Sequence, residues 1–174
     1  QWNAVIKIGE EVMMNKPTVL STGEWLFPIA VWHRSIHEAD GFKSDKEEEN
    51  RKAFAYKTVD CGQSFVILGG ADIRKRSFDE HMILEMSDGR LAMYIRTMYG
   101  IGVSYSYDGG KTWTKGEDTG WGGPCSRFFI RRLKSGRVLL INHYHYIGRS
   151  HLTAMLSEDE CRTWKYRLLL DERT

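Results

Sequence analysis

The chain has 174 residues, of which 41% are hydrophobic and 28% charged, and its formal net charge is +2 at pH 7. This composition is that of a globular protein with a sizeable core and excludes a disordered chain. The small net charge and the lack of a dense basic run argue against nucleic acid as a partner. No apolar run approaches the roughly 18 residues of a membrane helix. The composition leaves carbohydrates and protein surfaces as candidate binding partners.

Aromatic residues make up 12% of the chain, which contains seventeen Gly and only three Pro. This composition favours many short strands joined by tight turns. The chain opens Gln1-Trp2-Asn3, without Met or a signal peptide, so we expect a processed or truncated chain. Its cysteines have no metal-binding spacing and are predicted to be free thiols: Cys61, Cys125 and Cys161.

The first predicted unit, roughly residues 12–70, begins with a hairpin. Strand-like runs at 17–20 and 25–32 flank a turn that contains Gly23, and a Gly-containing two-residue turn between β-rich runs is a hairpin signal. An insertion with a dense charged run follows at 33–52. It is either a solvated surface loop or short helix, or a loop that overhangs a site.

The second and third predicted units, roughly 78–120 and 125–174, repeat this order with turns at Gly89 and Gly136. The run 102–107 alternates apolar and polar residues and is the predicted third strand of the second unit. The runs that flank the two turns are 82–86 with 91–96, and 128–133 with 138–143. The chain is therefore predicted to consist of repeated four-stranded antiparallel units.

A short polar box closes the third strand of each unit. The central copy consists of Ser106, Asp108, Gly110, Thr112 and Trp113. A downstream copy contains Asp159 and Trp164, with Cys161 where Gly is expected, and an upstream copy contains Asp60. The copies lie 48 and 51 residues apart, a period that is typical of a propeller blade.

The residue types of the box suit a turn. Asp108 can accept backbone N–H bonds across it, and Gly110 supplies a conformation that is costly for other residues. Thr112 is β-branched and suits strand entry, while the ring of Trp113 can cover the turn. We interpret the box as a structural staple and not as a catalytic site.

The boxes resemble the Asp-box, or bacterial neuraminidase repeat, of the sialidase superfamily, over nearly the whole chain from about Asn15 to Trp164. The phrase Glu80 to Leu91, followed by Tyr94 to Thr97, is also similar to bacterial sialidase-like proteins. The resemblance implies an all-β propeller, six-bladed when complete, of which this chain holds about half. Missing blades or a homo-oligomer would have to complete it. The resemblance also favours a secreted or periplasmic bacterial protein.

The second hairpin carries the main candidate residues. If Asp88-Gly89 is a two-residue turn, Glu80 lies opposite Thr97 and His81 opposite Arg96, so Glu80 and Arg96 share one end of the hairpin. The resemblance implies that Glu80 polarises a Tyr nucleophile and that Arg96 binds a substrate carboxylate. That Tyr would lie beyond this chain. The alternative is an ordinary edge salt bridge.

Blade symmetry supplies further substrate-binding candidates. Alignment of the hairpin turns places Arg127 and His143 at the positions of that pair in the third unit, and equivalent positions in a propeller surround one pocket. Arg149 lies eight residues before Ser157 and resembles the third member of the sialidase arginine cluster. The N-terminal Arg of that cluster is not visible in the sequence.

The first unit offers weaker candidates. The same alignment places Met14 opposite Ala30, and the nearby Lys16 is either a contact for an anionic substrate or a charge at the rim. An acid/base group would have to come from the insertion, where Asp40 and Glu38 are the nearest residues. No metal or cofactor is expected, because the pair His143 and His145 lacks an acidic third ligand.

Three functions remain open. The resemblance favours a sialidase-like glycoside hydrolase that acts on a terminal, anionic sugar, which is its carbohydrate partner. The second is a propeller hydrolase or lyase for another glycan, containing uronic acid or rhamnose, as the residues His81, His143, Tyr144 and His145 suggest. The third is a propeller that binds glycan or protein without catalysis.

Overall fold

The computed structural model describes residues 4–9, 11–31, 51–78 and 80–172, whose regular structure is entirely β. The first antiparallel sheet has the order β1 (Thr18–Val19), β2 (Trp25–Ala30), β3 (Ala53–Thr58), β4 (Val66–Ala71). The second contains β5 (Met82–Glu85), β6 (Leu91–Thr97), β7 (Gly100–Ser106) and β8 (Glu117–Asp118). The third contains β9 (Phe129–Arg132), β10 (Val138–His143), β11 (Leu152–Ser157) and β12 (Lys165–Asp171).

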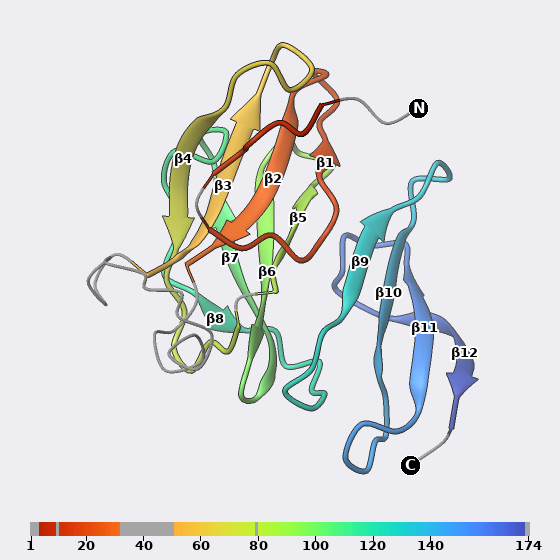
Figure 1. The fold of residues 1–174 in the computed structure, drawn as a ribbon. Coiled ribbons are helices and arrows are strands. Elements are labelled where there is room, and N and C mark those ends of the chain that lie inside the picture. Colours follow the sequence, from red (N-terminus) through yellow and green to blue (C-terminus); the bar gives the residue numbers. More distant parts are fainter. Residues whose placement is uncertain (1–3, 10, 32–50, 79, 173–174) are drawn as a thin grey trace.

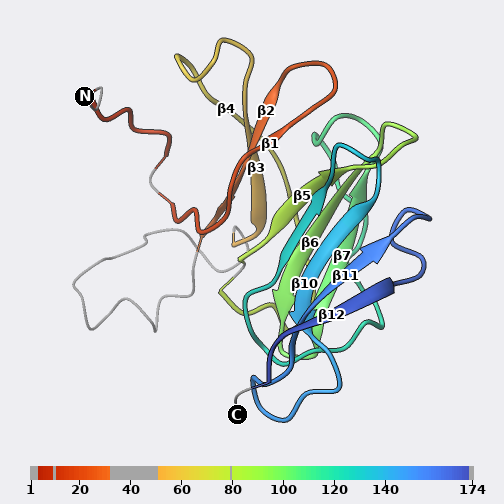
Figure 2. The same cartoon turned by 90° about the vertical axis from the view of Figure 1, so that its right-hand side faces the viewer.

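The strands of each sheet pair in chain order, so each sheet forms from one contiguous stretch (Figure 1). This confirms the predicted all-β architecture of four-stranded antiparallel sheets. The three sheets fan out from their first strands, and β5 contacts both β1 and β9 (Figure 2). The described residues include no helix that is long and apolar enough to cross a bilayer.

Two hydrophobic cores fill the spaces between neighbouring sheets. Successive residues of β5 point to opposite faces, because side chains alternate along a strand. Met82 and Leu84 therefore pack toward Ile130 and Leu140 of the third sheet, while Ile83 packs toward the first. A third, smaller cluster around Phe27, Ile29 and Tyr56 lies on the other face of the first sheet.

The hairpin turns contain three residues, and the predicted two-residue turn is wrong. The amide of Met86 donates to the Arg90 carbonyl at 2.9 Å, and the amide of Gly89 donates to the Met86 carbonyl at 3.0 Å. Gly89 closes the turn with φ at 84°, a left-handed conformation that glycine adopts without strain. Met82 consequently pairs with Tyr94, one residue away from the predicted register.

A shift of one residue in the pairing changes which side chains of the two strands lie on the same face of the sheet. The paired register ends at Met82 and Tyr94. Beyond it Thr97 bridges Arg76, and the Ser77 amide donates to the Arg96 carbonyl at 3.1 Å. The predicted pairings of Glu80 with Thr97 and of His81 with Arg96 are therefore wrong, and Glu80 reaches Arg96 through its side chain. His81 instead faces the first sheet, where its Nε2 lies 2.8 Å from the Phe54 carbonyl oxygen.

The start of the first sheet also departs from the predicted alignment. Val12, not Met14, pairs with Ala30, while Thr18 pairs with Leu26. The N-terminal strand therefore gains two residues between these points. Pro17 lies within that segment, and it lacks the N–H that a ladder needs. The predicted pairing of Met14 with Ala30 is wrong for this reason.

The central box is held together by its own side chains. Ser106 Oγ donates to Asp108 Oδ1 at 2.8 Å and accepts from the Gly110 amide at 2.8 Å. The Asp108 carboxylate accepts from the amide of Thr112 at 2.9 Å and from its hydroxyl at 2.6 Å. Trp113 Nε1 donates to the Gly110 carbonyl at 3.0 Å. These bonds fix the turn between β7 and the segment that follows.

The other two boxes repeat this pattern. Asp60 accepts from the Thr58 hydroxyl at 2.6 Å and from the Ser64 amide at 3.0 Å. Asp159 likewise accepts from the amide of Thr163 at 2.8 Å. Cys161 stands where the central box has glycine, with φ at 66°, and its buried side chain belongs to the core between the second and third sheets. Trp164 meets Trp121 edge to face at 4.9 Å.

The box carboxylates make stability sensitive to acid. The Thr112 hydroxyl bond lowers the pKa of Asp108 to about 2, the Thr163 hydroxyl bond does the same for Asp159, and the Ser64 hydroxyl bond also lowers the pKa of Asp60. A carboxyl with a lower pKa in the folded state stabilises the fold above its unfolded pKa of about 3.9, and this contribution is lost as pH falls toward 2.

We therefore expect the free energy of unfolding to fall between about pH 4 and pH 2, and Asp108→Asn to reduce that slope by about one proton. Urea titrations from pH 2 to 7 measure the slope. Asp72→Asn, which removes an exposed carboxylate outside the boxes, is the control. Equal slopes for Asp108→Asn and the unaltered chain would contradict the prediction.

Candidate functional site

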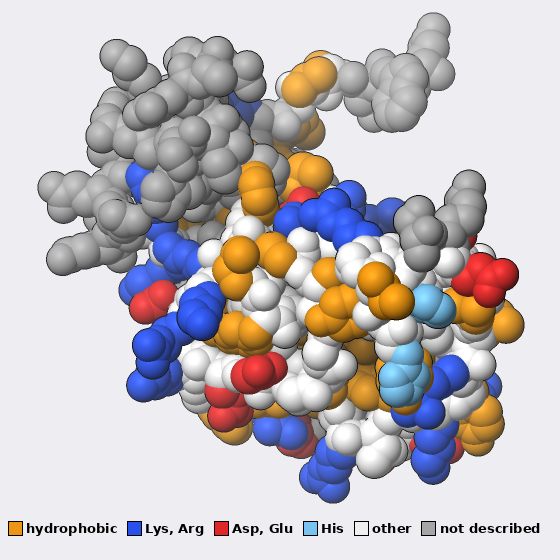
Figure 3. Space-filling view, turned by 90° about the horizontal axis from the view of Figure 1, so that it is seen from below, with side chains coloured by type: hydrophobic (Ala, Val, Ile, Leu, Met, Phe, Trp, Pro, Cys, Tyr) orange, Lys and Arg blue, Asp and Glu red, His pale blue; other side chains and the backbone are white. Residues whose placement is uncertain are grey.

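The boxes and the candidate site lie at opposite ends of the sheets. In each sheet the first hairpin turn and the box share one end, drawn at the top of Figure 1. Glu80 precedes β5, Arg96 lies near the end of β6, and Arg149 lies between β10 and β11, which brings all three to the other end. Viewed from that end, Lys, Arg and His side chains lie among hydrophobic and neutral surface (Figure 3).

A nearly buried ion pair forms the centre of the site. Arg96 Nη1 lies 2.7 Å from Glu80 Oε2, and each side chain is 10% exposed. Arg96 Nη2 donates to the Cys125 carbonyl at 3.1 Å, and the guanidinium carbon lies 4.9 Å from the centre of the Phe78 ring. Burial alone would lower the pKa of Arg96, but the hydrogen bonds to Glu80 and Cys125 raise it above its usual value. Glu80 is thus held beside a permanent cation.

A second guanidinium meets the same carbonyl. Arg149 Nη2 donates to Cys125 O at 3.2 Å, and the side chain is exposed. The two guanidinium groups are thus brought together at one carbonyl oxygen. Guanidinium groups are suited to bind planar anions such as carboxylates.

Arg127 joins the site through Asn15. Its Nε and Nη2 donate to Asn15 Oδ1 at 3.1 and 2.9 Å, and Nη2 also donates to the Met14 carbonyl. Asn15 Nδ2 in turn donates to the carbonyl oxygens of Glu80 at 2.9 Å and His81 at 3.0 Å. The hydrogen bonds therefore connect Arg127 to the strand that carries Glu80.

The other sequence candidates lie outside this network. His143 Nδ1 lies 2.7 Å from the Ser150 carbonyl oxygen. The observed register, extended by two residues, places His143 opposite Arg127, but their side chains make contacts with different partners. Lys16 lines a separate groove. Asp40 and Glu38 lie outside the described residues. Among the residues that the structure describes, no group of His, Cys, Asp and Glu side chains is arranged to hold a metal.

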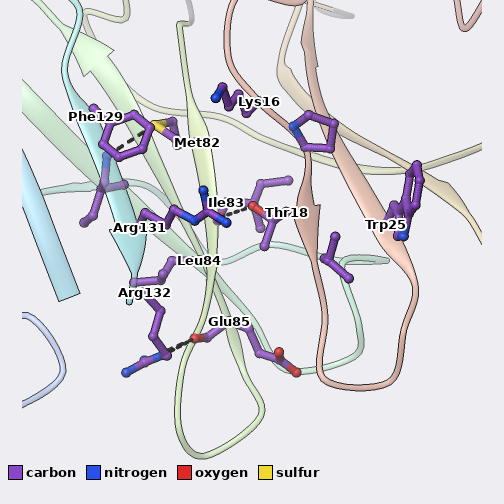
Figure 4. A pocket seen from close by; sticks show the side chains of 13 residues that line it. Lys16, Thr18, Trp25, Met82, Ile83, Leu84, Glu85, Phe129, Arg131 and Arg132 are labelled. Carbon is purple, nitrogen blue, oxygen red and sulfur yellow. Dashed lines mark hydrogen bonds between the residues drawn. The ribbon is translucent and has the colours of Figure 1, made fainter. Parts of the chain in front are cut away.

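The groove that contains Lys16 runs between the first strands of the three sheets and has a volume of about 430 Å³. Lys16 and Arg131 lie on its walls (Figure 4). Across it Thr18 Oγ1 donates to the Ile83 carbonyl at 2.6 Å, and Arg132 Nη2 donates to the Glu85 carbonyl at 3.1 Å. With Asn15, these side chains satisfy carbonyls along the open edge of β5 and join it to both neighbouring sheets.

Three parts of the candidate site were not predicted from the sequence. The Cys125 carbonyl is a backbone group, so no side chain marks it. The sequence drew attention to Asn15 only as the neighbour of Lys16. The one feature that could have indicated it is its position as a polar residue before Lys16-Pro17, at the start of a strand. Phe78, two residues before Glu80, could have been noticed as an aromatic partner for an arginine.

The chain resembles several solved bacterial proteins in fold. A Dyadobacter fermentans protein of unknown function aligns with a TM-score of 0.66 and 23% identity, over 90% of this chain and 41% of that one. The NanB sialidase of Streptococcus pneumoniae aligns at 0.63 and 19% identity, over 89% and 23%. The intramolecular trans-sialidase of Ruminococcus gnavus aligns at 0.60 and 20%, over 86% and 31%.

These identities establish the fold alone, and the chain spans less than half of each solved structure. Among curated proteins none matches the sequence significantly. The three sheets correspond to part of the propeller of the solved sialidases, which confirms the predicted fold. The family model described as the BNR repeat-like domain matches residues 6–174, so this chain belongs to that family and forms part of a sialidase-like β-propeller.

Proposed function

We propose that this chain carries part of the active site of a sialidase-like glycoside hydrolase that acts on terminal, anionic sugars. The observation that supports this most is the ion pair of Glu80 and Arg96, with Arg149 bound to the same Cys125 carbonyl as Arg96. The fold likeness to two solved sialidases is consistent with it.

In this proposal the guanidinium groups of Arg96 and Arg149 hold the carboxylate of the sugar. The Oε2 atom of Glu80 is bound to Arg96, whereas Oε1 has no bonded partner among the described residues. Oε1 is thus the atom that can accept a proton from a Tyr supplied by another part of the protein. The Tyr oxygen then attacks the anomeric carbon, an exception to the two-carboxylate scheme.

The leaving group needs a proton donor as its bond to the anomeric carbon breaks. Asp40 and Glu38 of the insertion remain the candidates for this role. The propeller must also be completed, because β12 exposes Tyr166 and Leu168 to solvent, the latter at 62%. Further blades or a second copy of the chain are the two candidates to cover this sheet.

One observation favours a different glycan. The third sheet places His143 and Tyr144 beside the loop that carries Arg149, and Tyr144 packs on His145 at 4.1 Å and under Arg167 at 4.5 Å. Such aromatic and imidazole groups suit a pocket for a uronic acid or for a rhamnose-containing glycan. This is the second candidate function.

A substrate panel separates the candidates. A protein that contains the whole propeller is assayed with fluorogenic glycosides of N-acetylneuraminic acid, glucuronic acid and rhamnose, and with acidic polysaccharides. We expect turnover of the sialoside. Turnover of a uronide or rhamnoside alone would establish the second candidate, and glycan binding with no turnover of any substrate would establish a binding protein instead.

A further inference from the structure

A second cleft lies between the second and third sheets, and its lining includes none of the residues of the candidate site. Its volume is about 400 Å³, which is within the range of small-molecule pockets. We propose that this cleft binds a neutral sugar through Glu117, Arg162 and the aromatic side chains beside them. The proposal is independent of the proposed hydrolase activity, because it concerns a different part of the surface.

The floor of the cleft is uncharged and firmly packed. It consists of Tyr94, Val103 and Cys161, which are buried in the core between the second and third sheets. Burial raises the pKa of the Cys161 thiol to about 11, so this group is neutral at physiological pH. A ligand in the cleft therefore meets charged groups only on its walls.

Two half-buried aromatic rings line the cleft, Trp121 and Tyr105. Trp121 stacks on Tyr94 at 5.1 Å and meets Trp164 edge to face at 4.9 Å, so its ring is held in one orientation. The guanidinium carbon of Arg90 lies 4.9 Å from the centre of the Tyr105 ring. Aromatic rings with a few polar groups beside them are the usual lining of a ligand pocket, and the C–H faces of a sugar ring can pack on them.

The charged residues of the lining have both signs. Three carry carboxylates and two carry guanidinium groups: Glu117, Asp118 and Glu160, with Arg90 and Arg162. An anionic ligand would be repelled by the carboxylates, and a cationic ligand by the guanidinium groups. The mixed lining therefore favours a ligand that is polar but has no net charge.

Two of these charged side chains are available to a ligand. Glu160 and Arg90 already form ion pairs at 2.7 and 2.9 Å. In the part of the chain that the structure describes, the side chains of Glu117 and Arg162 form neither a hydrogen bond nor an ion pair, and both residues are exposed. A carboxylate only accepts hydrogen bonds and a guanidinium only donates them, whereas a hydroxyl does both. Neighbouring sugar hydroxyls can therefore satisfy Glu117 and Arg162 together.

The test uses the 174-residue chain, labelled with ¹⁵N and titrated with the methyl glycosides of galactose, glucose and mannose. We expect at least one of these neutral sugars to shift the Trp121 Nε1–H signal saturably, with a Kd on the order of 1 mM. N-acetylneuraminic acid should leave that signal unshifted, because the carboxylates of the cleft repel it. The internal control is the Nε1–H signal of Trp113, which packs between the first and second sheets and should not shift.

Glu117→Gln and Arg162→Ala should each weaken binding of that sugar about tenfold, because each removes a hydrogen bond to a charged group. Both residues are exposed, so neither change should prevent folding. The matched controls are Glu158→Gln and Arg131→Ala, which alter exposed residues outside the cleft. They should change the affinity less than about twofold.

The proposal is overturned if no neutral sugar shifts the Trp121 signal saturably, or if either Glu117→Gln or Arg162→Ala binds as tightly as its matched control. It is also overturned if the acidic sugar shifts that signal as the neutral sugars do. Turnover of a sialoside by the complete propeller, or its absence, tests the proposed hydrolase alone.

Discussion

Glu80→Gln will lower the turnover of an anionic glycoside by about 10²- to 10⁴-fold, the range that general acid–base catalysis contributes. Gln has the same shape but cannot take up the proton. It also leaves the charge of Arg96 uncompensated at 10% side-chain exposure, so the affinity for an anionic sugar should not fall. Measurement of kcat and KM separately in the complete propeller tests both statements.

The matched control is Glu85→Gln, the same change in the strand that follows Glu80. Glu85 accepts bonds from the Ser21 amide and hydroxyl, both at 2.7 Å, at the box end of the sheets. Its substitution should leave kcat within about twofold, since an exposed hydrogen bond contributes only to stability. Unchanged turnover in Glu80→Gln would exclude Glu80 as the base.

Gly69→Ala will destabilise the chain by about 3 kcal/mol, at the upper end for an overpacked site. A Cβ at Gly69 would lie 2.1 Å from the carbonyl oxygen of Lys111 and 2.8 Å from its carbon. The Gly69 amide also donates to the Gly110 carbonyl at 2.8 Å, which attaches β4 to the central box. Because both contacts are with backbone, neither can move aside cheaply. Urea unfolding measures the loss.

Gly89→Ala provides the comparison, because it strains the backbone without a clash. Gly89 has φ at 84°, and nothing lies within 4 Å of an added Cβ. A non-glycine residue in this left-handed region costs about 1 kcal/mol. Gly69→Ala should therefore be the more destabilising change. If Gly89→Ala lowers the free energy of unfolding more than Gly69→Ala does, the close contact between β4 and the central box is not important for stability.

The repeated architecture was predictable because its signals are local. Strand alternation, a glycine in each hairpin turn and the Ser-x-Asp pattern all act within about ten residues. The register was not predictable, because Ser87-Asp88-Gly89 fits a turn of two or of three residues. The structure has the turn of three residues, in a hairpin whose Met82 and Leu84 are buried against the third sheet.

The site was predictable only in part. Glu80 and Arg96 were found through their motif, and a register error of one residue still left them at the same end of the hairpin. Asn15 binds carbonyls 65 and 66 residues away, and no pattern along the sequence reports such a contact. The two extra residues before Thr18 were also not predicted, since Pro17 indicates a break in the ladder but not how many residues the break contains.

The placement of the boxes at one end and the arginines at the other has an electrostatic consequence. A strand of six residues spans about 20 Å, roughly twice the distance over which physiological salt screens a charge. Protonation of Asp60, Asp108 and Asp159 in acid therefore leaves the potential at the candidate site almost unchanged. The pH dependence of folding and the pH dependence of ligand affinity should be governed by separate groups, so each can be altered without disturbing the other.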